Sequence, residues 1–332
     1  MEKKDNLYQK ILVPLDGSDL SEEALRYGES LAQALGSDLI LLHSCEIPSD
    51  AHHHMEQFYL EGLSRISRER MGQKIKVEPV ILQGYPPDDI IDYASKNNIS
   101  LIIMVTHSNR GIKRWVLGST TSRVVRKTGT PVLLINPLSP ATAFAKRSPC
   151  RIIVALDGSS TSEFILPYAE KLAMASKRGS EVTLFHVISP PRLDNKYILS
   201  GVTDSGIFGK EEAIGDGKVT SPLSSSRTSQ APPEMTSEDK SRLKALETGA
   251  YHYLEQASSK ITGQGITVNS QVAIGNAAEE IIKEENAINA DLIAMTTRGL
   301  SNSGMLFLGS VADRVLHTAS VPLLLVTPPL TK

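Results

Sequence analysis

Cysteine is scarce in this chain, and no charge of one sign dominates. Its two cysteines, Cys45 and Cys150, are too few for a disulfide framework and too far in sequence from a His/Cys cluster to indicate a zinc site. Both are expected to be reduced and structural, and no metal site is predicted. Because 35 basic residues face 37 acidic ones, no basic surplus indicates a nucleic-acid partner.

Targeting and membrane signals are missing too. No apolar stretch of signal-peptide length follows the charged start, and no run approaches the roughly 20 apolar residues of a membrane span. A cytoplasmic protein without a membrane partner is therefore expected. Apolar residues make up 40% of the 332 positions and charged residues 22%, a profile typical of a globular chain long enough for two domains.

Signatures of common enzyme classes do not occur. The sequence contains no Gly-x4-Gly-Lys-(Ser/Thr) phosphate loop, no Gly-x-Ser-x-Gly nucleophile elbow and no His-Glu-x-x-His metal helix. Each candidate site described below holds one carboxylate, without a paired acid and base for hydrolysis. Any catalysis is expected to be slow.

What the chain does contain is an internal repeat. "ILVPLDGS" at 11–18 returns as "IIVALDGS" at 152–159, and "PVLLINP" at 131–137 returns as "PLLLVTP" at 322–328. The first offset is 141 residues and the second is 191. About 50 extra residues must therefore lie early in the second copy.

These offsets predict the domain boundaries. The first domain is assigned to 1–137, a linker to 138–149 and the second domain to 150–330. An insertion at about 189–239 is rich in Ser, Pro and Gly, so it cannot bury enough surface to offset its ordering entropy. It is interpreted as a mobile surface loop, with a phosphorylated or partner-binding loop as the alternative.

Apolar runs alternate with helical patterns in each copy. The runs "ILV", "LILLH", "VEPVIL", "SLIIMVT" and "PVLLIN" of the first copy lack the alternation of a half-exposed sheet. Asn276 and Glu279 of the second copy stand at capping-box spacing, and Pro167 predicts a kink or a late helix start. The alternation predicts two tandem, doubly wound α/β domains, each a parallel sheet with helices on both faces.

A turn that suits phosphate follows one apolar run of the second copy. In "MTTRGLSNSGMLFLGSVADRVL" Gly299 permits close backbone approach to an anion, and Gly309 and Ser310 open a helix whose free N–H groups favour phosphate. The alternative is structural: Ser310 and Asp313 have N-cap spacing. Ligands of open parallel sheets bind where the strand order reverses, which is where this turn and "LDGS" are expected.

This turn resembles the ATP-binding motif of the universal stress protein family, Gly-x2-Gly-x9-Gly-(Ser/Thr). The resemblance covers both copies apart from the insertion and includes the aspartates Asp16 and Asp157. It implies five-stranded parallel sheets of the adenine nucleotide α-hydrolase-like type, which hold ATP or AMP, with or without Mg²⁺. It also implies that the two copies pair through their final strands as an internal pseudo-dimer, and it allows a homodimer of the whole chain.

The resemblance also implies roles for residues of the second copy. Asp157 would meet the base and ribose, the Val187 backbone would recognise adenine, and Gly299, Gly309 and Ser310 would hold phosphates. Thr297 could offer a hydroxyl, although ordinary strand-end hydrogen bonding is its alternative. The corresponding residues of the first copy are Asp16, Gly118 and Ser119.

The two copies match the motif unequally. Thr296 replaces one of the three glycines in the second copy, whereas Val105 and Ser108 replace two in the first. A β-branched valine is expected to crowd a phosphate or forbid the backbone torsion needed there. The second copy is therefore predicted to bind nucleotide, and the first to bind it weakly or not at all.

Several other residues are open to two interpretations. His107 and Arg298 occupy equivalent turn positions, where either could face a phosphate or solvent. The histidines at 52–54 are interpreted as exposed loop residues, because consecutive side chains point in different directions.

We expect a regulatory protein of the stress response whose nucleotide state is read by an unknown protein partner. The alternatives are an interaction scaffold that binds no nucleotide, and a slow ATPase.

Overall fold

The computed structural model describes most of the chain, in eight stretches. These are residues 7–45, 50–72, 75–108, 115–136, 150–176, 179–189, 237–298 and 308–329. The predicted linker at 138–149, most of the predicted insertion and Gly299 lie outside them. The boundaries assigned to the two domains stay a prediction.

The first half of the chain alternates strands and helices. Its elements are β1 (Lys10–Pro14), α2 (Asp19–Leu35), β2 (Asp38–Cys45), α3 (Asp50–Met71), β3 (Val77–Gln83), α4 (Pro86–Lys96), β4 (Leu101–Val105), β5 (His107–Ser108), β6 (Trp115–Val116), α5 (Ser119–Lys127) and β7 (Val132–Ile135). Ser18 caps α2 by accepting a hydrogen bond from the Ser21 N–H, and Gly36 ends the helix in the left-handed region. The short hairpin of β5 and β6 follows β4.

The second half repeats this order. Its elements are β8 (Cys150–Leu156), η1 (Ser162–Ile165), α7 (Leu166–Ala175), β9 (Ser180–Ile188), α8 (Ser237–Ser258), β10 (Ile266–Ile274), α9 (Ala277–Ile288), β11 (Leu292–Thr296), α10 (Ser310–Thr318) and β12 (Leu323–Val326). A 3-10 turn precedes α7, which begins one residue before Pro167. The predicted late start is confirmed, because proline is tolerated only in the first turn of a helix.

Ten strands form one sheet in the order β10-β9-β8-β11-β12-β7-β4-β1-β2-β3. Within each half the five strands are parallel. The final strands β7 and β12 join the halves by antiparallel pairing, with Leu134 opposite Leu323. The predicted fold class is confirmed, and the final strands pair as the resemblance implied.

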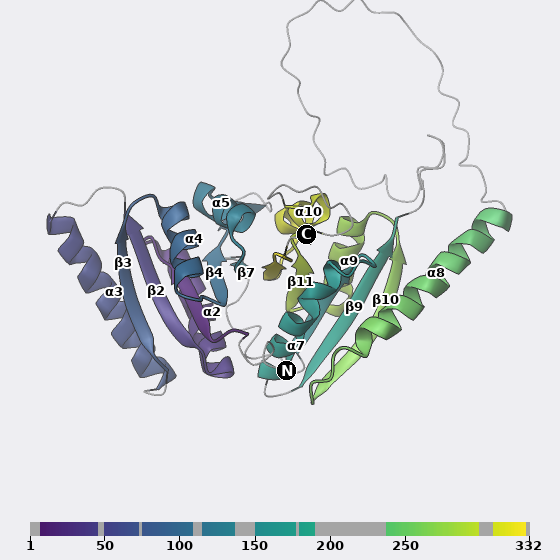
Figure 1. Cartoon of the computed structure of the whole chain (residues 1–332), viewed down its shortest axis with the longest axis horizontal. Helices are drawn as coiled ribbons and strands as arrows, with labels where there is room; N and C mark the ends of the chain where they lie inside the picture. The colour runs from purple at the N-terminus through teal and green to yellow at the C-terminus, as the bar shows by residue number, and fades with distance from the viewer. Residues whose placement is uncertain are drawn as a thin grey trace, which may run out of the picture. The chain divides into compact units, whose positions relative to one another are not determined.

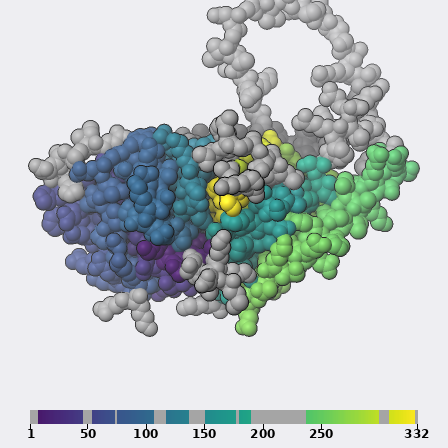
Figure 2. All heavy atoms as spheres, in the orientation of Figure 1, coloured from purple at the N-terminus to yellow at the C-terminus, as the bar shows by residue number. Residues whose placement is uncertain are grey.

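Helices lie on both faces of the sheet in each half, as Figure 1 shows. The alternation of side chains along β1 explains why both faces need cover: Ile11 and Val13 enter one apolar cluster and Leu12 enters the other. In the space-filling view the purple to blue atoms of the first half form one closely packed body (Figure 2). The inner strands β4, β7, β11 and β12 are apolar and almost fully buried because neither face meets water, whereas the edge strand β10 is polar in its middle and partly exposed.

One sequence-based interpretation is wrong in detail. The histidines at 52–54 belong to the helix α3 instead of a loop, although His54 is exposed as expected. The insertion predicted at about 189–239 stays a prediction, and α8 begins near its expected end, at Ser237. The error over the histidines comes from the weak amphipathic character of α3, which a search for apolar periodicity passes over. Within the described ranges, every helix is too short or too polar to cross a bilayer.

Candidate functional site

Each half contains a cavity at the carboxyl ends of its strands. The one in the second half lies where the strand order reverses between β8 and β11, and its volume is about 270 Å³. Its lining includes five of the six residues predicted for this half: Asp157, Val187, Thr297, Gly309 and Ser310. The sixth, Gly299, lies outside the described residues. Residues that are 153 positions apart in sequence therefore meet at one place.

Asp157 follows β8 in a tight turn. Gly158 adopts a φ of 87°, which brings the next backbone N–H toward the carboxylate. The Asp157 Oδ1 atom accepts hydrogen bonds from the Ser159 N–H (3.0 Å) and the Ser159 hydroxyl (2.6 Å). These bonds hold the carboxylate at the end of the strand, where it lines the cavity.

The start of α10 forms the opposite wall. Gly309 is the N-cap residue, and no side chain caps the helix. The alternative in which Ser310 is the N-cap is therefore wrong, since Ser310 is the first helical residue. A free N-terminus presents N–H groups and a partial positive charge. The Gly309 N–H donates to the Thr297 carbonyl (2.7 Å), and a Cβ at Gly309 would lie 3.2 Å from that oxygen. Glycine thus permits the helix to begin close against the end of β11.

Arg298 adds a cation to the same cavity. The residue is among those that line the pocket, and it is only 9% exposed. The Nη2 atom donates to the Pro328 carbonyl at 3.4 Å, whereas the buried Nη1 atom has no hydrogen-bond partner among the described residues. A buried guanidinium without a full set of acceptors favours an anion beside it. From the sequence, Arg298 could face either a phosphate or solvent, because a position directly after a strand does not determine whether a side chain is buried.

The remaining walls are apolar or already hydrogen-bonded. Val187 of β9 lines the cavity with Phe185 and Met295, a surface that suits a planar aromatic group. The Thr297 hydroxyl lies 3.4 Å from the Thr327 hydroxyl, as expected of ordinary strand-end hydrogen bonding.

The cavity of the first half is similar in volume, about 290 Å³. The residues predicted for this half, Asp16, Gly118 and Ser119, all line it. Gly118 is the N-cap residue of α5, and no side chain caps this helix. This cavity therefore also has a free helix N-terminus. Asp16 repeats the contacts of Asp157: its Oδ1 atom accepts from the Ser18 N–H (3.0 Å) and the Ser18 hydroxyl (2.5 Å).

Asp16 is the charged side chain among the described residues that line the first cavity. Partial burial acts to raise the pKa of Asp16, but the hydrogen bonds from Ser18 and Ser21 outweigh it and hold the pKa below its ordinary value. Among the described residues that line this cavity, none is an arginine or a lysine. Val105 lines it at the end of β4, the position that Thr296 occupies at the end of β11.

A sequence model of the universal stress protein family matches residues 7–136 and 218–327. The chain belongs to the universal stress protein family. Family members that resemble it include the stress response protein NhaX of Bacillus subtilis, which is 30% identical over 53% of this chain and 96% of its own length. A solved universal stress protein from Archaeoglobus fulgidus covers 96% of this chain and 98% of its own, at 20% identity and a TM-score of 0.58.

One solved relative is in complex with a nucleotide. This universal stress protein from Archaeoglobus fulgidus, in complex with dAMP, is 26% identical and covers 39% of this chain and 98% of its own, with a TM-score of 0.33. The bound dAMP is an observation on that relative.

Proposed function

We propose that this stress-response family member binds ATP or AMP in the cavity of its second half, and that a protein partner reads the nucleotide state. The observation that carries the proposal is the buried guanidinium of Arg298 in that cavity. A phosphate group in the cavity would face the free N-terminus of α10, and the positive charge of Arg298 would attract it. Both features favour an anion in this cavity.

The rest of the cavity supports a nucleoside. Phe185, Val187 and Met295 offer an apolar surface to the base, and Asp157 supplies a hydrogen-bond acceptor for the ribose. Adenine recognition by the Val187 backbone, phosphate binding by Gly299 and a Mg²⁺ ion beside a triphosphate belong to the same proposal. Asp157 is the only carboxylate among the described residues that line the cavity. This arrangement suits binding more than hydrolysis.

The proposal assigns the second half as the main nucleotide site. The first cavity has a carboxylate and a helix N-terminus, but the part of its lining that the structure describes holds no arginine or lysine. A phosphate there would gain less electrostatic stabilisation. Regulation then requires that the partner prefer one nucleotide state, because linkage demands a difference in affinity between the states.

The test is to measure nucleotide binding by the full chain. Nucleotide released by denaturing the purified protein is identified by mass spectrometry, and ATP and AMP are titrated calorimetrically into the stripped chain with and without Mg²⁺. We expect about one nucleotide per chain. Arg298→Gln should weaken binding about 10- to 100-fold, the range for a lost hydrogen bond to a charged group.

Arg314→Gln is the matched control. Arg314 lies on the exposed side of α10, so its loss removes the same charge without touching the cavity and should leave the affinity nearly unchanged. No bound nucleotide and no heat of binding in the wild-type chain would overturn the proposal in favour of a scaffold. Equal losses in both variants would show that general surface charge, and not Arg298 in the cavity, attracts the ligand.

A further inference from the structure

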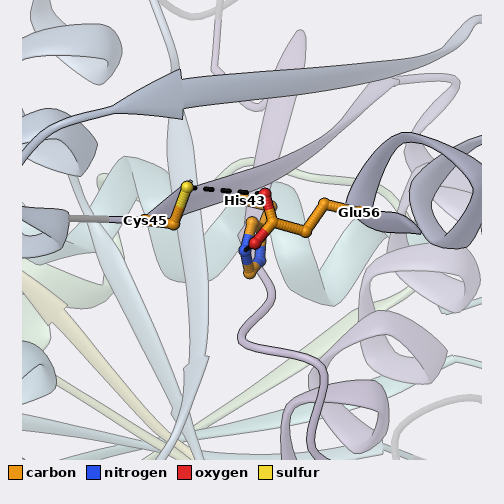
Figure 3. Close-up of side chains that lie close together, drawn as sticks. All are labelled: His43, Cys45 and Glu56. Atoms are coloured by element: carbon orange, nitrogen blue, oxygen red, sulfur yellow. Dashed lines mark hydrogen bonds and ion pairs between the residues drawn. The ribbon is translucent and has the colours of Figure 1, made fainter. Parts of the chain in front are cut away.

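Three side chains of different chemistry meet between β2 and α3. The imidazole of His43 and the thiol of Cys45 project from β2 toward the carboxylate of Glu56 on α3, as Figure 3 shows. His43 Nε2 lies 3.3 Å from Glu56 Oε1, and the Cys45 thiol donates to Glu56 Oε2 at 3.4 Å. One nitrogen, one sulfur and one oxygen all lie within 4.8 Å of one another.

A backbone contact decides which nitrogen of His43 is available. His43 Nδ1 lies 2.8 Å from the Leu15 carbonyl oxygen, which can only accept a hydrogen bond. Nδ1 must therefore carry the proton, and in the neutral ring the lone pair is on Nε2, which faces Glu56. In that form two acceptors, Nε2 and Oε1, face each other across 3.3 Å, whereas a second ring proton would make the contact an ion pair. A cation between them would satisfy both.

We propose that His43, Cys45 and Glu56 form a zinc site, with the fourth coordination position left to water or another small ligand. The donors are those that zinc prefers, because imidazole, thiolate and carboxylate suit this ion, whereas magnesium and calcium take oxygen ligands alone. The backbone hydrogen bond of His43 resembles the outer-shell contact that orients ligating histidines. The site is independent of the nucleotide proposed above.

The spacing of the donors fits a tetrahedral ion. With ligand bonds of about 2.0–2.3 Å, donors around zinc stand about 3.3–3.5 Å apart. His43 and Cys45 lie 3.3 and 3.4 Å from different oxygens of Glu56, and because one donor atom from each residue lies within 4.8 Å of the others, small side-chain rotations would close the site around an ion. The charges also balance, since a dication with one thiolate, one carboxylate and one neutral imidazole is neutral. Neutrality matters here because all three side chains are half-buried, where uncompensated charge is costly.

Metal binding would change the state of the thiol. Burial, and then the hydrogen bond and charge of Glu56, raise the pKa of Cys45 above its ordinary value. A bound dication favours the thiolate. Zinc binding should therefore release the thiol proton and weaken as the pH falls.

The strand geometry separates this cluster from the first cavity. Successive side chains of β2 point to opposite faces of the sheet, so His43 and Cys45 lie on one face while Ser44 lines the cavity on the other. The second half offers a natural comparison. His186 keeps the same contact, with Nδ1 2.9 Å from the Leu156 carbonyl, but Ile188 stands where Cys45 does and the ring of Tyr253 lies beside the imidazole. The hydrogen bond between a histidine Nδ1 atom and a backbone carbonyl occurs in both halves, whereas the histidine, cysteine and glutamate donors come together in the first half.

Cobalt is the probe for the test, because a thiolate bound to Co²⁺ gives a charge-transfer absorption in the near ultraviolet. Co²⁺ is titrated into the reduced, metal-stripped full chain without nucleotide, and Zn²⁺ is then added in competition. We expect one equivalent of cobalt to produce the band and zinc to remove it. Cys45→Ser should abolish the band, and Glu56→Gln should weaken metal binding at least 10-fold.

Cys150→Ala is the matched control, because Cys150 is the other cysteine and lies buried at the start of β8. It should leave the band unchanged. Circular dichroism of each variant establishes that it is folded, and zinc should raise the melting temperature of the wild-type chain but not of folded Cys45→Ser. No band in the wild-type chain, or a band that survives Cys45→Ser, would overturn the proposal. Asp157→Ala leaves the cluster intact, so metal binding by that variant separates this site from the nucleotide proposal.

Discussion

The first and second halves of the chain form cavities of about 290 and 270 Å³ at equivalent places, the carboxyl ends of their strands. The side chains that line the two cavities differ. In the second half Thr296 ends the fourth strand and Arg298 follows it, whereas Val105 ends the fourth strand of the first half. The first half instead collects a histidine, a cysteine and a glutamate on its other face. The comparison teaches that strand order makes the cavity and that a few turn residues decide what it can hold.

The largest expected effect tests the part in which the halves are alike. Leu134 of β7 and Leu325 of β12 hold equivalent places in the repeat, and both are at most 1% exposed. Each Leu→Ala substitution should lower the free energy of unfolding by about 2–5 kcal/mol, through lost burial and the cavity left behind. Urea unfolding measures both. A loss confined to one variant would contradict the structural equivalence of the final strands.

The carboxylates at the two strand ends should differ in function. Asp157→Ala should lower the affinity for ATP about 10-fold or more, since it removes a hydrogen-bonding charge from the proposed site. Asp16→Ala is its counterpart in the first half and should change the affinity little. Calorimetric titration of both variants checks this. If Asp16→Ala were the more damaging change, the main nucleotide site would have to be moved to the first half.

A smaller effect should come from exchanging a single strand-end residue. The hydroxyl of Thr296 is buried and donates to the Arg298 carbonyl at 2.6 Å. Thr296→Val installs the residue of the first half and leaves that carbonyl without its donor, which should cost about 1–2 kcal/mol of unfolding free energy.

The loosened Arg298 backbone should also weaken ATP binding a few-fold. Val105→Thr, the reverse exchange, is the control and should not weaken binding at all. Urea unfolding and calorimetry measure the two effects, and unchanged stability in Thr296→Val would remove the reason for assigning Thr296 a positioning role.

The smallest effect concerns the pH dependence of stability. The pKa of Asp16 is held below its ordinary value, so its ionisation stabilises the folded chain above the unfolded pKa, about 3.9. That contribution is lost as the pH falls through the lower folded pKa. Ser18→Ala removes the donor hydroxyl and should raise the folded pKa toward 3.9, which shrinks this contribution. An NMR titration of the Asp16 carboxyl follows the shift, and an unmoved pKa would assign the effect to other contacts.

Much of the fold could be predicted because the alternation of apolar runs and helical patterns occurs twice, once in each copy of the repeat. The strands, the parallel arrangement and the late start of α7 at Pro167 all follow from local rules. The helices α3 and α8 were missed because their apolar residues are few and weakly periodic. Within the cavities, the aspartates could be predicted from the repeat and the glycines before α5 and α10 from the resemblance to the family motif, and all four residues line the cavities.

The sequence by itself determined the tandem repeat, the sheet class and the residues at the strand ends, because these depend on neighbours close along the chain. Only the tertiary structure decided that Arg298 is buried, with no partner for Nη1 in the part of the chain that the structure describes, and that Glu56 of α3 meets His43 and Cys45 of β2. Burial and convergence of side chains depend on how helices pack on the sheet. No local pattern in the sequence encodes that packing.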